Sequence, residues 1–174
     1  MRVFFMLCSL FAGSQAWALQ VGDQVPDLAV PSTAGHPLNL RDFDGQWVVL
    51  YFYPRAFTPG CTAQTCSLRD EHAEMHQRGV VVLGASLDNE ERQRSFKEEH
   101  GLPFELLSDN DKELARAFDA LMIGELMAAR RTFIINPEGR LAFRFDRPQT
   151  HDHAEEVLAK LDELREIRET GSQK

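Results

Sequence analysis

Two cysteines near the middle of the chain, Cys61 and Cys66, are the side chains best suited to redox chemistry. They stand in a segment that begins at Pro54 and contains Thr58-Pro59-Gly60 directly before Cys61. A thiolate is the reactive form of cysteine toward a peroxide or a disulfide, whereas the neutral thiol is a poor nucleophile. The structure around the Cys61 sulfur therefore decides what this pair can do.

The residues before Cys61 predict that a helix begins there. Thr58 suits the N-cap, and Pro59 suits the first helical position because its missing N–H would have no partner there. Cys61 then lies in the first turn, where unpaired N–H groups and the helix dipole favour a thiolate. The N–H groups of Gly60 and Cys61 could also bind the oxygen leaving a peroxide, and the Thr58 hydroxyl could orient its second oxygen. Simpler roles remain open, with Thr58 as a plain cap and Pro54 as a strand terminator.

The spacing of the two cysteines predicts that an intact helix keeps them apart. Five residues of α-helix rotate by about 500° and rise by about 7.5 Å, which puts the two Cα atoms roughly 8–9 Å apart. A disulfide requires Cα atoms within about 7 Å. We therefore expect a switch, in which the helix unwinds locally when Cys66 captures a sulfenic acid on Cys61. The alternative is a permanent structural disulfide, which conflicts with the helical pattern.

Hydrophobic patterns predict the elements that position these cysteines. Apolar runs indicate buried strands, the last two joined by a turn, at residues 47–53, 80–85, 132–135 and 141–145. Amphipathic patterns indicate helices at residues 61–78, 89–100, 112–118 and 153–168. This alternation predicts an α/β fold with a mixed central sheet and helices on both faces. In such folds functional groups gather where a strand ends and a helix begins, which is where Cys61 lies.

Details of the last helix and of the histidines are also predicted. Its apolar positions are expected to be buried, and Glu156 is expected to pair with Lys160 one turn away. Those positions are Val157, Leu158, Leu161, Leu164 and Ile167. His72 is expected to be a partly buried core residue. His151 and His153 have no nearby cysteine or carboxylate cluster, so we expect a solvated helix start and no metal site.

The chain has 174 residues and a net charge of −8, which suit one domain and argue against nucleic-acid binding. Residues 1–18 combine Arg2, a short apolar run and the small-x-small sequence Ala16-Trp17-Ala18. This pattern is typical of a secretory signal peptide cleaved after Ala18. It predicts export, to the periplasm of a bacterium, and a single mature domain over residues 19–174 without stable membrane association. A buried N-terminal helix or strand is the alternative.

Pro54, Thr58 and Cys61 match the active-site motif of peroxiredoxins. Residues 51–70, YFYPRAFTPGCTAQTCSLRD, closely resemble the Q-type branch, also called bacterioferritin comigratory protein, and the looser similarity covers most of the chain. The resemblance implies a thioredoxin-like fold, with Cys61 as the peroxidatic cysteine and Cys66 as the resolving cysteine. It further implies reduction of hydrogen peroxide and organic hydroperoxides, recycling by a thioredoxin-like dithiol donor, and no metal or other cofactor. A monomer is expected, with a dimer as the alternative.

The resemblance also implies an arginine beside the sulfur, three residues before an aromatic residue in a strand. Counting back from Phe133 selects Arg130, whereas alternation along the strand would point Arg131 to the opposite face. A guanidinium there would stabilise the thiolate and hydrogen-bond the peroxide. Residues 119–129 depart from the family pattern. The export signal is a second departure, because most relatives work in the cytoplasm.

Two other functions remain open at this stage. A thioredoxin-like protein-disulfide oxidoreductase normally has a C-x-x-C motif, whereas this chain has C-x4-C. A non-catalytic exported domain would use the same two cysteines as a structural disulfide.

Overall fold

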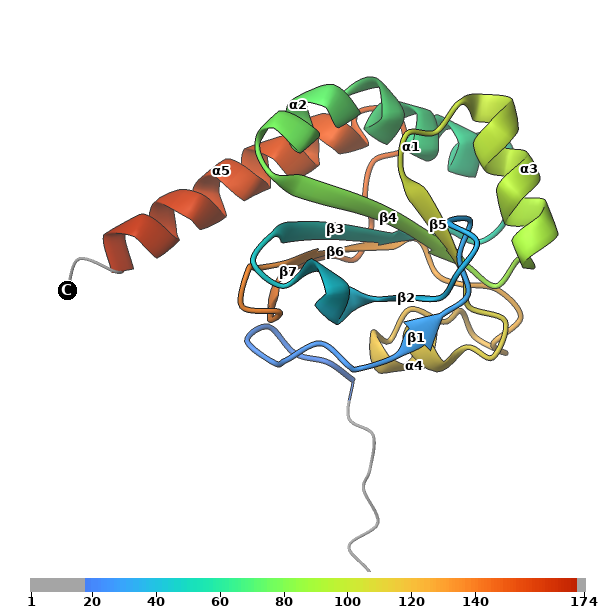
Figure 1. The fold of residues 1–174 in the computed structure, drawn as a ribbon, viewed down its shortest axis with the longest axis horizontal. Helices are drawn as coiled ribbons and strands as arrows, with labels where there is room; N and C mark the ends of the chain where they lie inside the picture. The colour runs from blue at the N-terminus through green and yellow to red at the C-terminus, as the bar shows by residue number, and fades with distance from the viewer. Residues whose placement is uncertain (1–17, 172–174) are drawn as a thin grey trace, which may run out of the picture.

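The computed structural model describes residues 18–171 and has a five-stranded sheet at its centre (Figure 1). The strand order is β5-β4-β3-β6-β7. Strands β3 (Trp47–Phe52), β4 (Val80–Ser86) and β5 (Glu105–Ser108) pair in parallel. Strand β6 (Arg131–Ile135) pairs antiparallel with both β3 and β7 (Leu141–Phe145). The sheet is therefore mixed, as predicted.

The central strand β3 is buried on both faces because nearly every side chain in it is apolar. Trp47, Val49 and Tyr51 pack into one hydrophobic cluster, and alternate residues Val48 and Leu50 pack into the other. Every residue of β3 is buried. A strand of this kind must be covered by other elements on both sides.

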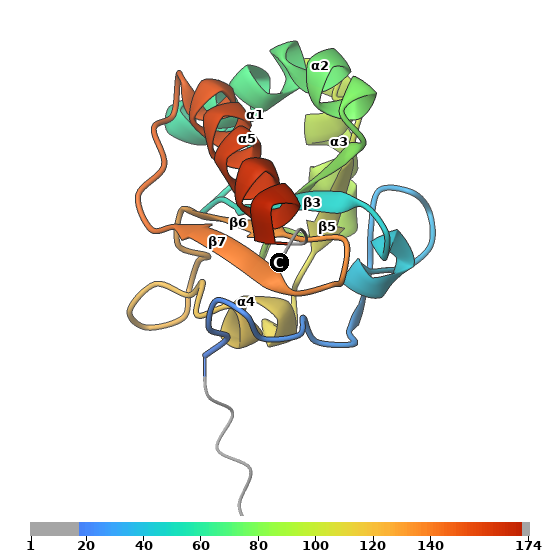
Figure 2. The ribbon, with the colours of Figure 1, turned by 90° about the vertical axis from the view of Figure 1, so that its left-hand side faces the viewer.

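Helices cover both faces of the sheet, which confirms the predicted α/β fold (Figures 1 and 2). One face carries four helices: α1 (Pro59–Asp70), α2 (His72–Gln77), α3 (Glu90–His100) and α5 (His153–Gly171). The other face carries α4 (Glu113–Ala117) with the 3-10 helix η1 (Leu40–Phe43) and the short antiparallel pair β1 (Ala29–Val30) and β2 (Leu38–Asn39). No helix among these residues is long and apolar enough to cross a membrane.

The helix predicted over residues 61–78 is in fact two helices. Helix α1 ends at Asp70, and Glu71 has φ −97° and ψ 6°, which leaves the helical range before α2 begins at His72. Neither proline nor glycine stands at this break, so the sequence contains no signal for it. Strand β5 and the pair β1–β2 were also not predicted, because runs of two to four residues show no clear periodicity.

The last helix is partly mispredicted. Val157 and Leu161 are buried as expected, but Ile167 is 59% exposed. Ile167 belongs to the final turns of α5, which project beyond the sheet (Figure 1). The expected pair of Glu156 with Lys160 is absent, since Lys160 instead forms an ion pair with Glu163.

His153 corrects a second expectation, because it is completely buried rather than solvated. Its Nε2 lies 2.8 Å from Thr132 Oγ1, and its Nδ1 lies 3.4 Å from a Glu156 carboxylate oxygen. Burial lowers the pKa of His153 from 6.5 to about 4, against the opposing effect of Glu156. The side chain is therefore neutral in the folded protein at neutral pH.

This burial predicts a loss of stability in mild acid. Between pH 6.5 and about 4 the unfolded chain binds a proton at His153 that the folded chain does not. The contribution of His153 to the free energy of unfolding should therefore fall as pH drops through this window, by about 2–3 kcal/mol in all. Urea unfolding at pH 7 and pH 4.5 checks this, with His153→Gln as the comparison. Equal losses of stability in both proteins would contradict the prediction.

Candidate active site

The start of α1 has the backbone arrangement that the sequence predicts. Thr58 is the N-cap residue, with φ −90° and ψ 146°, and Pro59 occupies the first helical position. The Thr58 side chain does not cap the helix, because its hydroxyl donates to the carbonyl oxygen of Arg55 at 3.0 Å. With its proton committed in this way, the hydroxyl oxygen still has lone pairs that can accept a hydrogen bond.

Cys61 lies in the first turn of α1 on the side that packs against the sheet. Its side chain is 1% exposed and belongs to the core cluster that also contains Tyr51. The N–H groups of Gly60 and Cys61 are among the first four of the helix, which have no acceptor within it. The sulfur thus lies in a water-poor setting near unpaired donors, where electrostatic interactions are stronger than in water.

Arg130 points its guanidinium at this turn from the residue just before β6. Nη2 donates to the Cys61 sulfur at 3.3 Å, and Nη1 donates to the Gly60 carbonyl oxygen at 3.3 Å. Nη1 also donates to Gln64 Oε1 at 2.5 Å. The contact with the sulfur is a charge-assisted hydrogen bond, which is stronger than one between neutral groups.

Arg131 lies on the opposite side and takes no part in this arrangement. It forms ion pairs with Asp119 at 2.7 Å and with Asp146 at 3.5 Å. The structure thus places the two arginines as strand alternation predicts.

Gly60 permits the close approach of Arg130. A Cβ atom at this position would lie 3.2 Å from Arg130 Nη2, which is tighter than ordinary van der Waals contact. Because that guanidinium is held by three acceptors on α1, it has little freedom to move away.

Gln64 is a site residue that sequence reasoning missed. It lies three positions after Cys61, on the same face of α1, and is completely buried. Its oxygen holds Arg130, whereas its amide nitrogen has no hydrogen-bond partner. The available signal was its i+3 spacing from Cys61, since buried polar side chains are uncommon and require partners.

Cys66 is half-buried near the middle of α1, and both cysteines are free thiols. It does not belong to the buried face of the helix, which consists of Cys61, Gln64, Thr65 and Leu68. The structure is therefore the dithiol form, with the helix between the two sulfurs intact.

Pro54 follows the end of the β3 run and is partly buried. It borders a cavity of about 190 Å³ together with Arg55, Leu126 and Met127. The last two belong to the atypical segment 119–129, in which Ile123 and Leu126 are highly exposed. This segment therefore lies beside the loop that leads to Cys61.

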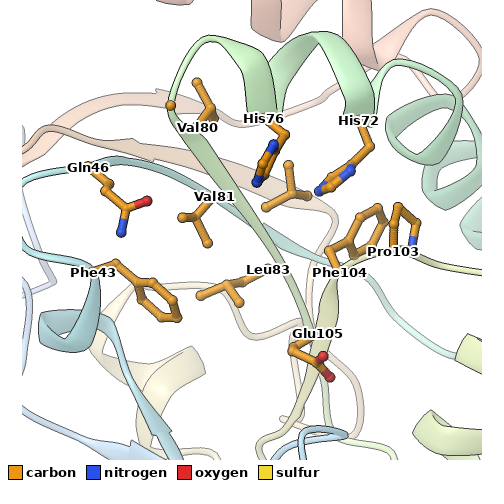
Figure 3. Close-up of a pocket in the computed structure, with 12 residues that line it drawn as sticks. Phe43, Gln46, His72, His76, Val80, Val81, Leu83, Pro103, Phe104 and Glu105 are labelled. Atoms are coloured by element: carbon orange, nitrogen blue, oxygen red, sulfur yellow. The ribbon is translucent and has the colours of Figure 1, made fainter.

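A separate cleft of about 260 Å³ lies between α2, β4 and β5 (Figure 3). His72, His76 and Phe104 line it, but none of the predicted site residues do. His72 is half-buried as expected, and burial lowers its pKa, helped by the neighbouring His76. Within residues 18–171, no group of three or more His, Cys, Asp or Glu side chains is arranged to hold a metal ion.

A buried thiol at a helix N-terminus, contacted by an arginine and backed by a mixed sheet, defines a thiol-based oxidoreductase. Comparison with known families narrows this class, because residues 21–144 match the AhpC/TSA family. The chain therefore belongs to the AhpC/TSA family, in the Bcp/PrxQ branch of the peroxiredoxins, which are thiol-dependent peroxidases with a thioredoxin-like fold.

Individual relatives support this assignment. Peroxiredoxin Bcp of Bacillus subtilis is 38% identical over 85% of this chain and 98% of its own length. Peroxiredoxin Bcp of Escherichia coli K12 is 40% identical over 80% of this chain and 94% of its own. A mutant of Xylella fastidiosa PrxQ has a similar crystal structure, with a TM-score of 0.78 and 30% identity over 84% of this chain and 97% of its own.

Proposed function

We propose that Cys61 is the residue that attacks the peroxide and that Cys66 resolves the product as an intramolecular disulfide. The observation that carries this assignment is the contact of Arg130 Nη2 with the Cys61 sulfur at 3.3 Å, in the first turn of α1. Among residues 18–171 no arginine or lysine donates a hydrogen bond to the Cys66 sulfur, and the nearby Arg69 pairs with Asp70 at 2.7 Å.

In the first step the Cys61 thiolate attacks the terminal oxygen of the peroxide in line with the O–O bond. The S–O bond forms as the O–O bond breaks, and the leaving oxygen takes a proton and departs as water or an alcohol. Arg130 and the N–H groups of Gly60 and Cys61 donate to the oxygens as negative charge develops. The lone pairs of Thr58 Oγ1 accept the peroxide O–H. Cys61 is left as a sulfenic acid.

In the second step the Cys66 sulfur attacks the Cys61 sulfenic sulfur, forming the disulfide and releasing water. An intact α1 holds the two Cα atoms too far apart for this bond, so the first turns of the helix must unwind. A thioredoxin-like dithiol then reduces the disulfide and is itself oxidised, which returns Cys61 and Cys66 to the thiol form. One peroxide is reduced for each dithiol oxidised.

Stopped-flow mixing of the reduced protein with hydrogen peroxide tests this proposal. Peroxide should be consumed and one disulfide should form per chain, and a dithiol such as dithiothreitol should restore turnover. Reduction of insulin without peroxide consumption would instead favour a protein-disulfide oxidoreductase.

Oxidation should also lower the helix content. Forming the Cys61–Cys66 disulfide should melt the beginning of α1 and reduce the far-ultraviolet circular dichroism signal near 222 nm by the equivalent of about one to two turns. Cys66→Ser, treated with one equivalent of peroxide, serves as the control and should keep its full signal. A disulfide that forms with no change in this signal would contradict the predicted unwinding.

We also propose that the protein is exported and acts as a monomer. The signal-like sequence of residues 1–18 lies outside the described residues, and the export proposal rests on its composition alone. The monomer proposal rests on the resemblance to the Q-type branch. An exported enzyme requires an electron donor outside the cytosolic thioredoxin pool. N-terminal sequencing of the protein from the producing cell should find a start at Leu19, and sedimentation should give a mass of one chain.

A further inference from the structure

The loop between β3 and α1 is held from the side by two residues of neighbouring segments, Asp88 and Arg92. Ala56, which is completely buried, donates its N–H to Asp88 Oδ2 at 2.7 Å. Its carbonyl oxygen accepts from Arg92 Nη2 at 2.7 Å. Both backbone groups of one buried loop residue are thus satisfied by side chains outside the loop.

Asp88 is held in place by several contacts, and Arg92, which is partly exposed, pairs with it. They form an ion pair with Arg92 Nε 3.2 Å from Asp88 Oδ1, and the Asp88 side chain is only 10% exposed. Ser86 Oγ donates to Asp88 Oδ2 at 2.9 Å, and buried Gln93 donates to Ser86 Oγ at 2.9 Å. Asp88 is therefore tied to the end of β4 and, through Ser86, to α3, while Arg92 of α3 is tied to Asp88 and to Ala56.

The next residue in the loop, Phe57, has a backbone conformation that an aromatic side chain disfavours. Its φ is +66°, in the left-handed region, which is uncommon for any residue with a bulky side chain. Its ring packs against Phe96, with centroids 5.1 Å apart, and under the Arg92 guanidinium at 5.1 Å. The contacts of the Phe57 ring with Phe96 and Arg92 of α3 thus help to hold the strained backbone of the loop in this conformation.

This loop leads directly to the N-cap of α1, where the proposed disulfide requires unwinding. We propose that Asp88 and Arg92 form a latch that holds residues 55–58 in the conformation for peroxide attack. Release of the latch accompanies the unwinding that lets Cys66 reach Cys61. Asp88 and Arg92 are positioning residues, and the inference rests on the roles proposed above for the two cysteines.

The latch would set the competition between two fates of the Cys61 sulfenic acid. Condensation with Cys66 gives the disulfide and water, whereas a second hydrogen peroxide gives the sulfinic acid and water. If the latched form dominates strongly, a substitution that lowers the ratio of latched to unlatched molecules tenfold still leaves most molecules latched. Those molecules can still react with the first peroxide. The same change raises the unlatched population, and with it the rate of disulfide formation, about tenfold.

Arg92→Ala and Asp88→Ala test the latch, because each leaves one backbone group of Ala56 without its partner. We expect disulfide formation to become about tenfold faster, while the rate of the first reaction with hydrogen peroxide falls less than twofold. The peroxide concentration that converts half of Cys61 to sulfinic acid should rise about tenfold. Rapid quench with mass spectrometry measures both products. Asp88→Asn, which keeps an acceptor oxygen for Ala56, should show a smaller effect.

Arg94→Ala is the matched control, since Arg94 is an exposed arginine on the same helix. It should behave as the unsubstituted protein. Unchanged or slower disulfide formation in both Arg92→Ala and Asp88→Ala would overturn the latch, provided the unsubstituted protein forms the sulfenic acid.

Hydrogen exchange gives a second test that needs neither a variant nor peroxidase activity. The Ala56 amide should be protected in the dithiol form and should exchange at least tenfold faster once diamide has oxidised the two cysteines. Equal protection in both forms would overturn the latch. Failure of hydrogen peroxide to produce a sulfenic acid would instead count against the proposed function.

Discussion

Replacing Cys61 with serine should abolish peroxide consumption, with a loss of at least about a thousandfold in rate, because the only proposed nucleophile is removed. A serine hydroxyl at the same position is not ionised near neutral pH, so neither the helix dipole nor Arg130 can activate it comparably. The measurement is the second-order rate constant with hydrogen peroxide, followed by loss of peroxide under single-turnover conditions.

Cys66→Ser is the matched control for this substitution. It removes a thiol from the same helix but leaves Cys61 and Arg130 untouched. It should still consume one peroxide per chain and accumulate a sulfenic acid that dimedone traps, and it should then stop or become overoxidised. Full inactivity of Cys66→Ser in a single turnover would reverse the roles assigned to the two cysteines.

Replacing Arg130 with methionine should lower the rate of peroxide reduction by about 10²–10³, the range found when one donor to a developing oxyanion is removed. The Arg130 guanidinium donates three hydrogen bonds, to Cys61, Gly60 and Gln64, and methionine can donate none of them. Methionine fills a similar volume, so the fold should persist. Stopped-flow kinetics with hydrogen peroxide at neutral pH checks the effect.

Arg131→Met provides a control at the neighbouring position. Arg131 pairs with Asp119 and Asp146 and does not contact the cysteine. Its removal should lower stability by about 1 kcal/mol or less and leave the rate within about twofold. If the two substitutions slowed the reaction equally, the assignment of Arg130 as the thiolate partner would have to be abandoned.

The central sheet and the main helices were predictable from the sequence because their patterns are long. The run over residues 47–53 has no polar interruption, which indicates a strand buried on both faces, and β3 is such a strand. Helix α3 matches the helix expected over residues 89–100, with Asn89 as its N-cap and Gly101 as its C-cap. The break at Glu71 was not predictable because neither proline nor glycine marks it, and strand β5 was not predictable because its four residues show no clear periodicity.

The site shows the same difference between features that neighbouring residues determine and features that they do not. The position of Cys61 in the first turn of a helix follows from Thr58, Pro59 and Gly60, since capping and proline preferences act between neighbours in the chain. The choice of Arg130 came from the family resemblance, which counts three residues back from Phe133. Strand alternation, which is local, set Arg131 aside. The acceptor role of Gln64 was missed because it depends on a guanidinium that arrives from another element.

The sequence by itself indicated Cys61 as the candidate nucleophile, and it determined its place at the start of a helix and the spacing that forbids a disulfide while that helix is intact. These properties are set by residues a few positions apart, through backbone geometry. Only the tertiary structure decided which side chains surround the sulfur, that His153 is buried, and that Asp88 and Arg92 hold Ala56. Those contacts join segments far apart in sequence, and the packing of helices on the sheet alone determines which of them meet.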